Sequence, residues 1–114
     1  MSQHAGLTEE RWARFDLDQQ VLMIANEMNR NGRLLGEQAA GSRLRGYERI
    51  LRLTDLTVAV QSRPALRREL LRWRDLIAAL YIAEAPEPEA HRAAFRVLLQ
   101  LRPLAAKQIP ALLP

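Results

Sequence analysis

The sequence predicts a single all-α domain over residues 1–114, folded as an antiparallel four-helix bundle with a short C-terminal helix. Apolar side chains recur every three or four residues along four segments, the pattern of amphipathic helices. No segment shows the alternation of apolar and polar residues that is typical of a half-buried strand. Short connections join the segments, and short connections favour antiparallel neighbours. A chain of 114 residues has room for one core.

The first predicted helix runs from about residue 17 to 31. Asp16 and Gln19 have the spacing of a capping box, in which each side chain bonds the backbone N–H of the other. The apolar stripe follows at 4-3-4 spacing: Leu17, Val21, Ile24 and Met28. Gly32 after Asn31 predicts a left-handed C-cap. Upstream, Thr8 followed by two glutamates predicts a further helix start.

The second predicted helix runs from about residue 41 or 42 to 60. Its apolar residues cover more than half of the helix circumference at 100° per residue: Leu44, Tyr47, Ile50, Leu51, Leu53, Leu56, Thr57 and Val58. A helix that is apolar on so many sides is buried on more than one of them. We therefore expect it to be the central element of the bundle or part of a subunit interface.

The third and fourth predicted helices are separated by a proline-rich turn. Ser62 is the expected N-cap of the third helix, with Pro64 in its first turn. Its stripe extends to about residue 83: Leu66, Leu70, Trp73, Ile77 and Leu80. Pro86 and Pro88 predict a rigid turn, because proline lacks the N–H that a helix interior needs. The fourth helix then continues to about residue 101, and a short helix is expected over 104–109.

Composition narrows the classes of protein that are compatible with the chain. There is no cysteine, so neither a disulfide framework nor a thiolate metal site is expected. Charged residues interrupt every apolar stretch before the roughly 18 residues that a membrane span requires. The first ten residues lack the apolar core of a secretory signal. We therefore expect a cytoplasmic protein that does not contact a membrane.

Candidates for catalysis or metal binding are few. The histidines are His4, near the N-terminus, and His91, which Glu87 precedes by one helical turn. A di-metal site in a helical bundle uses Glu-x-x-His twice on facing helices, and the chain has no second copy. No Gly-x-Ser-x-Gly motif and no phosphate-binding glycine loop occur. We expect a solvated His91, no enzyme activity, no metal, no cofactor and no small-molecule substrate.

Arginine dominates the middle of the chain. Residues 30–74 hold eleven arginines and four acids, whereas residues 1–29 hold two arginines and five acids. Guanidinium groups on neighbouring helix faces bind a phosphate backbone independently of base sequence. The candidate nucleic-acid-binding residues are Arg45, Arg49, Arg52, Arg63, Arg67, Arg68 and Arg72. The alternative is a solvated surface with local pairs such as Glu48 with Arg52, in an arginine-rich chain from a GC-rich genome.

Asp55 lies at the edge of the apolar arc of the second helix. A carboxylate at such a position is costly to bury without a partner. Arg74 on the third helix is the expected partner, which would make the pair a structural one.

Two motifs carry a resemblance to known proteins. Residues 48–57 read E-R-I-L-R-L-T-D-L-T and residues 68–75 read R-E-L-L-R-W-R-D. Together with I-A-N-E-M-N-R at 24–30, they resemble a pattern of small prokaryotic helical proteins that have no assigned activity. More loosely, the chain resembles the four-helix-bundle group of ribosomal-RNA intervening-sequence proteins and retroelement accessory variability determinants. That resemblance implies a basic, ring-forming oligomer that holds RNA beside a reverse transcriptase.

These observations predict a non-enzymatic accessory protein that oligomerises, or docks on a larger protein, and contacts RNA or DNA through the arginines. One alternative is an adaptor or homo-oligomer that binds no nucleic acid. Another is a small helical subunit of a CRISPR effector complex, which the chain matches in size and basicity. The second helix and the leucine-rich C-terminus, which includes Leu104 and Leu113, are the surfaces expected to mediate oligomerisation.

Overall fold

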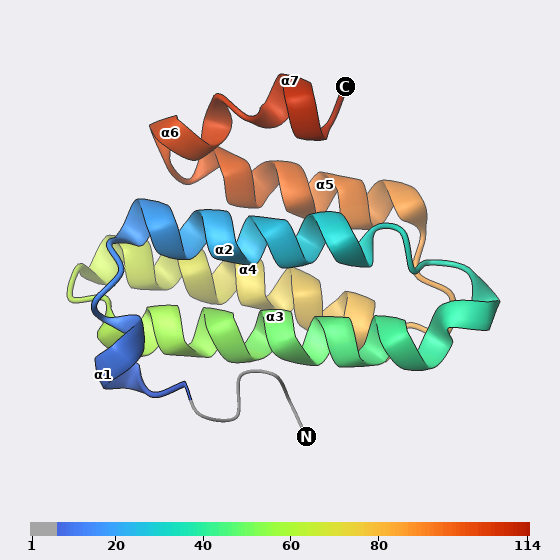
Figure 1. Ribbon diagram of the computed structural model, residues 1–114, viewed down its shortest axis with the longest axis horizontal. Helices are drawn as coiled ribbons and strands as arrows, with labels where there is room; N and C mark the ends of the chain where they lie inside the picture. Colours follow the sequence, from blue (N-terminus) through green and yellow to red (C-terminus); the bar gives the residue numbers. More distant parts are fainter. Residues whose placement is uncertain (1–6) are drawn as a thin grey trace.

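The structure, a computed structural model, describes residues 7–114 except for the side chain of Glu37. This part of the chain is helical and contains no strand, which confirms the expected all-α class. Figure 1 shows the four longest helices, α2 to α5, running side by side. The elements in chain order are α1 (Glu9–Trp12), α2 (Leu17–Asn31), the 3-10 helix η1 (Glu37–Ala39), α3 (Ala40–Val60), α4 (Pro64–Ile82), α5 (Pro88–Gln100), α6 (Pro103–Ala106) and α7 (Ile109–Leu112).

Helix starts follow local chemistry in most cases. The capping box of α2 is present, since Asp16 Oδ1 accepts from the Gln19 N–H at 2.8 Å and Gln19 Oε1 accepts from the Asp16 N–H at 2.9 Å. Thr8 caps α1 through its side chain. Ser62 does not cap α4, because the N-cap is Arg63 and Pro64 at N1 leaves one fewer N–H to satisfy.

The ends of the helices differ from expectation in two places. Gly32 caps α2 with φ −59°, and no glycine among the described residues has a positive φ, so the predicted left-handed cap is wrong. The single helix expected over 104–109 is instead two one-turn helices, α6 and α7. Pro103 and Pro110 lie in the first turns of these helices, where proline starts a helix rather than ending it.

The helix α3 is the central element. It packs against α1, α2 and α4, while α5 packs against α2 and α4. Consequently α2 and α3 form one face of the molecule, and α4 and α5 form another. The apolar arc of α3 is used mainly inside the chain: Tyr47, Ile50 and Leu53 are at most 1% exposed. The expectation that this helix is the central element therefore describes most of the arc, whereas Leu44 remains 37% exposed.

The C-terminal segment folds back on the helices. The helix α6 packs against α5 and α2, and Figure 1 shows α6 and α7 lying along α5. Leu113 is buried in the core, whereas Leu104 is 52% exposed. The leucine-rich C-terminus is therefore partly buried against the rest of the chain. Within residues 7–114, no helix combines the length and the apolar character needed to cross a membrane.

Candidate nucleic-acid interface and the buried polar network

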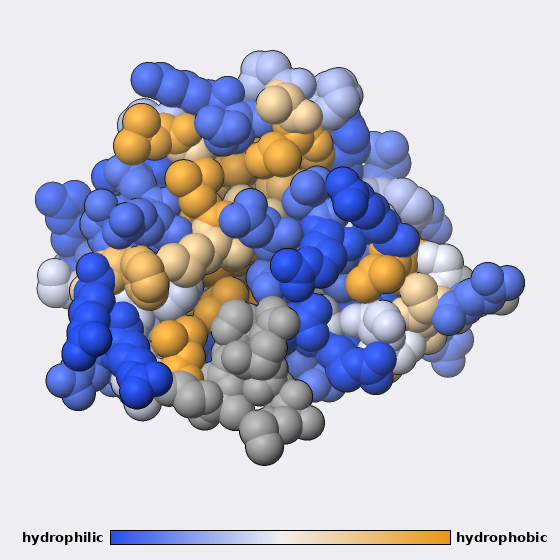
Figure 2. Space-filling view, viewed as in Figure 1, coloured by the Kyte–Doolittle hydropathy of each residue, from blue (hydrophilic) through white to orange (hydrophobic). Residues whose placement is uncertain are grey.

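The seven candidate arginines lie in three places rather than together on neighbouring helix faces. The first place is the edge of α3 that faces α2, the second is the start of α4, and the third is the edge of α4 that faces α5. Figure 2 shows strongly hydrophilic side chains over the α2 and α3 side of the molecule, interrupted by apolar ones.

A buried carboxylate organises the arginines between α2 and α3. Glu27 of α2 has a side chain only 8% exposed, and its Oε2 lies 3.3 Å from Nε of Arg49. Arg30, one turn along α2, brings Nη1 to 3.6 Å from the same oxygen. Two guanidinium groups from different helices therefore meet over one acid. The bond from Arg49 uses Nε, so its two Nη groups keep their N–H donors for another anion.

Arg45 and Arg52 flank Arg49 along the same edge of α3. Residues three and four apart are neighbours on a helix surface, so the three side chains form a row. Both flanking residues are exposed: Arg45 donates to Ser42 Oγ at 3.3 Å and Arg52 donates to the Leu7 carbonyl at 3.3 Å. We call Arg30, Arg45, Arg49 and Arg52 the basic face. Arg30 belongs to it but was not among the sequence candidates.

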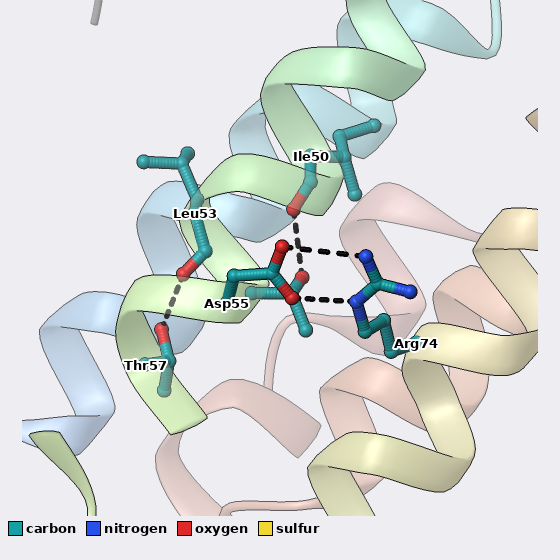
Figure 3. Close-up of polar contacts among 6 residues, drawn as sticks. Ile50, Leu53, Asp55, Thr57 and Arg74 are labelled. Atoms are coloured by element: carbon teal, nitrogen blue, oxygen red, sulfur yellow. Dashed lines mark hydrogen bonds and ion pairs between the residues drawn. The ribbon is translucent and has the colours of Figure 1, made fainter. Parts of the chain in front are cut away.

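The opposite edge of α3 is acidic and is tied to α4. Arg74 donates from Nε to Asp55 Oδ1 at 2.5 Å and from Nη2 to Oδ2 at 3.3 Å, as Figure 3 shows. This bond raises the pKa of Arg74. Tyr81 of α4 donates to Glu48 Oε1 at 2.9 Å, which raises the pKa of Tyr81. The expected pair of Asp55 and Arg74 is therefore present, and with Glu48 it separates the basic face from the arginines of α4.

The environment of Asp55 is more solvated than the sequence suggested. Its side chain is 48% exposed and that of Arg74 is 34% exposed. The pair therefore lies at the surface of the α3–α4 contact. Burying the Asp55 carboxylate costs little at this position, so the partner is less necessary than we expected. On another side of α3, away from this pair, Thr57 donates to the Leu53 carbonyl at 2.8 Å, so this hydroxyl is satisfied within α3 (Figure 3).

The four candidate arginines of α4 do not join the basic face. Arg63 is the exposed N-cap of α4, and Arg67 donates to the Gln61 carbonyl in the α3–α4 connection at 3.4 Å. Arg72 lines a hollow between α4 and α5, and Arg68 lies one turn before it on the same side of α4.

His91 is part of a buried polar network, so the expectation of a solvated histidine is wrong. It is 4% exposed, Nδ1 lies 2.8 Å from the hydroxyl of Tyr47, and Nε2 lies 2.9 Å from the Met28 carbonyl. A carbonyl only accepts, so Nε2 carries the proton and Nδ1 accepts from Tyr47. Burial lowers the pKa of His91 and raises the pKa of Tyr47 to about 12.

The buried network extends to the start of α3. Asn31 donates from Nδ2 to the Arg43 carbonyl at 3.3 Å, and Arg43 donates from Nη2 to the Glu84 carbonyl at 3.2 Å. Arg43 is 4% exposed, which explains why this arginine cannot join the basic face. The network links α2, α3, α5 and the turn before α5.

This network is not arranged for acid–base or metal chemistry. A hollow of about 340 Å³ adjoins His91, but both ring nitrogens are already engaged by Tyr47 and Met28. A general base needs a free lone pair within reach of a substrate proton. Among the described residues, no three His, Cys, Asp or Glu side chains cluster in a way that could hold a metal ion. His4 lies outside the described residues.

The sequence held signals for the residues that were missed. Glu27 lies within the apolar stripe of α2, one residue before Met28, and a carboxylate at a buried position needs basic partners. Arg30 follows it at the i+3 spacing of such a partner. His91 precedes Phe95 and Leu98 by four and seven residues, which places it on the apolar face of α5.

Comparisons with protein-family models, with curated proteins and with solved structures found no match to the chain.

Proposed function

We propose that the protein is a non-enzymatic helical module, built as an antiparallel four-helix bundle, that binds the phosphate backbone of RNA or DNA through the basic face. The observation that carries the proposal is the meeting of Arg30 and Arg49 on one oxygen of Glu27, with Arg45 and Arg52 on either side of Arg49. Two guanidinium groups thus meet one carboxylate, and two more lie beside Arg49 on α3.

The electrostatics of this cluster favour an anionic ligand. Like charges one helical turn apart destabilise a helix by about 0.2–0.5 kcal/mol per pair. Arg49 is offset by Glu27, but Arg45 and Arg52 form no salt bridge with an acid among the described residues and add to this repulsion. A phosphate backbone relieves this repulsion and matches the planar fork of arginine. The side chain of Arg30 is 57% exposed, and Arg45 and Arg52 are exposed as well, so three of the four groups are accessible to a polyanion.

The basic face is suited to contacts that do not depend on base sequence. Tyr47, the aromatic residue on this part of α3, is fully buried. Base stacking needs accessible aromatic rings, and base-edge recognition needs side chains inserted into a groove. We therefore expect affinity to come from phosphate contacts and to be similar for different sequences.

Fluorescence anisotropy with a labelled single-stranded oligonucleotide at low salt tests the proposal. The variant Arg45→Gln/Arg52→Gln removes two exposed charges of the basic face while keeping Glu27 paired. We expect its affinity to fall about tenfold or more. The matched control is Arg63→Gln/Arg68→Gln, which makes the same change in net charge on α4 and should bind nearly as well as the wild type. Equal losses in both variants would contradict a defined face.

A further inference from the structure

An apolar groove lies between α4 and α5, on the face away from α2 and α3. It has a volume of about 630 Å³ and is lined by alanines of both helices, with Leu76, Leu80 and Val97 as its larger side chains. Leu76 and Val97 also line an adjoining hollow of about 510 Å³, which reaches Trp73 and Leu101. The two hollows therefore form one groove along most of α4.

Two large apolar side chains that solvent reaches line this groove, Leu76 of α4 and Val97 of α5. Leu76 is 44% exposed and Val97 is 40% exposed, whereas Ile82 and Leu71, at 81% and 45%, belong to α4 but line neither hollow. The other described elements pack elsewhere: α1 against α3, and α6 against α5 and α2. An exposed apolar patch of this kind marks an interaction surface.

The two ends of the groove carry opposite charge. At the α4–α5 turn, Glu87 lines the groove and Glu84 precedes it by three residues. At the other end, Arg72 and Glu69 line the adjoining hollow, and Arg68 lies one turn from Arg72, which leaves this end positive. A helix rises about 1.5 Å per residue, so Arg72 lies about 20 Å from Glu84 along the groove.

We propose that the occupant of this groove is a second copy of the chain, packed with its α4 antiparallel to the first. A two-fold axis across the middle of the groove, near Leu76, places the Glu87 end of each copy on the Arg72 end of the other. This relationship is what an isologous dimer requires, because one patch must be complementary to itself. Alanines in the groove allow close approach of the backbones, and Leu76, Leu80 and Val97 supply the larger side chains.

The size of the face sets the expected affinity. The surface that contains the groove is about 21 Å long from Glu69 to Ala83. It is about 20 Å wide, because it spans two helices, α4 and α5, of about 10 Å diameter each. A patch of this area lies toward the small end of specific interfaces, so we expect a dimer with a micromolar Kd. The basic faces of both copies, on α2 and α3, then point outward and are available to the same nucleic acid.

Sedimentation velocity across the micromolar range tests this arrangement, with circular dichroism to confirm folding. Leu76→Glu places a charge in the groove and should give a monomer at every concentration. Leu44→Glu is the matched control, because Leu44 is 37% exposed on α3, outside the groove, and this variant should remain a dimer. A wild type that stays monomeric throughout, or a dimer broken by Leu44→Glu instead, overturns the proposal.

Charge reversal distinguishes a second copy from any other occupant. Arg72→Glu and Glu87→Arg should each weaken the dimer about tenfold, because each creates two repulsive pairs across the axis. The double variant should restore the wild-type Kd. Arg72 and Glu87 lie at opposite ends of the groove within one chain, so restoration requires contact between copies. Failure of the double variant to restore the dimer overturns the antiparallel arrangement. None of these substitutions touches the basic face, so nucleic-acid binding by monomeric variants can be measured separately.

Discussion

The hydroxyl of Tyr47 lies 2.8 Å from Nδ1 of His91, and this buried hydrogen bond joins α3 to α5 across the core. Both helices pack against α2 and α4, so the bond links two elements that lie diagonally opposite each other. Nε2 of His91 donates to the Met28 carbonyl, which fixes the ring on α2 as well. One histidine thus ties three helices together.

Removing the hydroxyl of Tyr47 tests how much its hydrogen bond to His91 stabilises the fold. Tyr47→Phe leaves Nδ1 of His91 as a buried acceptor without a donor, which costs about 1–3 kcal/mol. We expect the free energy of unfolding, measured with urea, to fall by that amount. As a control, Tyr81→Phe removes an exposed hydroxyl bonded to Glu48 and should change stability much less. Equal losses of stability in the two variants would show that the buried hydrogen bond stabilises the fold no more than the exposed one.

His91 also predicts how stability depends on pH. Because burial lowers its pKa in the folded protein, the unfolded chain binds a proton first as the pH falls. The stabilisation that neutral His91 contributes is therefore fully present above its pKa in the unfolded chain, about 6.5. It is lost as the pH falls from there toward the lower pKa of His91 in the folded protein. We expect wild type to lose more stability than His91→Gln between neutral pH and about pH 5. Parallel pH profiles would contradict this assignment.

Gly46 allows α2 and α3 to approach closely. A Cβ at this position would lie only 1.9 Å from Oδ1 of Asn31, a side chain that is 1% exposed. Gly46→Ala forces Asn31 away from the Arg43 carbonyl, and overpacking plus the lost bond outweigh a gain in helix propensity of about 1 kcal/mol. We expect a net loss of at least about 2 kcal/mol. Gly36→Ala, which meets nothing within 4 Å, is the control and should be neutral or slightly stabilising.

Asp55 and Arg74 should contribute little to stability despite their short contact. Exposed ion pairs typically contribute about 0.2–1 kcal/mol, and both side chains here are at least one third exposed. We expect Asp55→Asn and Arg74→Gln each to cost less than about 1 kcal/mol, with a coupling of about 0.2–1 kcal/mol in a double-mutant cycle. A loss of several kcal/mol on removing Arg74 would show that the pair is a major structural element.

The sequence predicted the helices well because each has a local signal. The capping box at Asp16 and the apolar stripes of α2 to α5 depend on residues a few positions apart. The basic face depends on how α2 and α3 pack together, and this is why Arg30 was missed and the seven arginines were expected on neighbouring helix faces. His91 was misplaced because its neighbours in the chain, Glu87 and Glu89, are exposed, while its burial depends on Tyr47 and Met28 from other helices.

The salt dependence of nucleic-acid binding tests the proposed function most directly. Each phosphate contact to a single strand contributes about 0.7 to the slope of log K against log salt concentration, so four arginines predict a slope of about −3. Arg45→Gln/Arg52→Gln should flatten it by one to two units, whereas Arg63→Gln/Arg68→Gln should leave it nearly unchanged. Absence of binding by folded wild type at low salt, or a slope that only the second variant flattens, would contradict the basic face as the nucleic-acid interface.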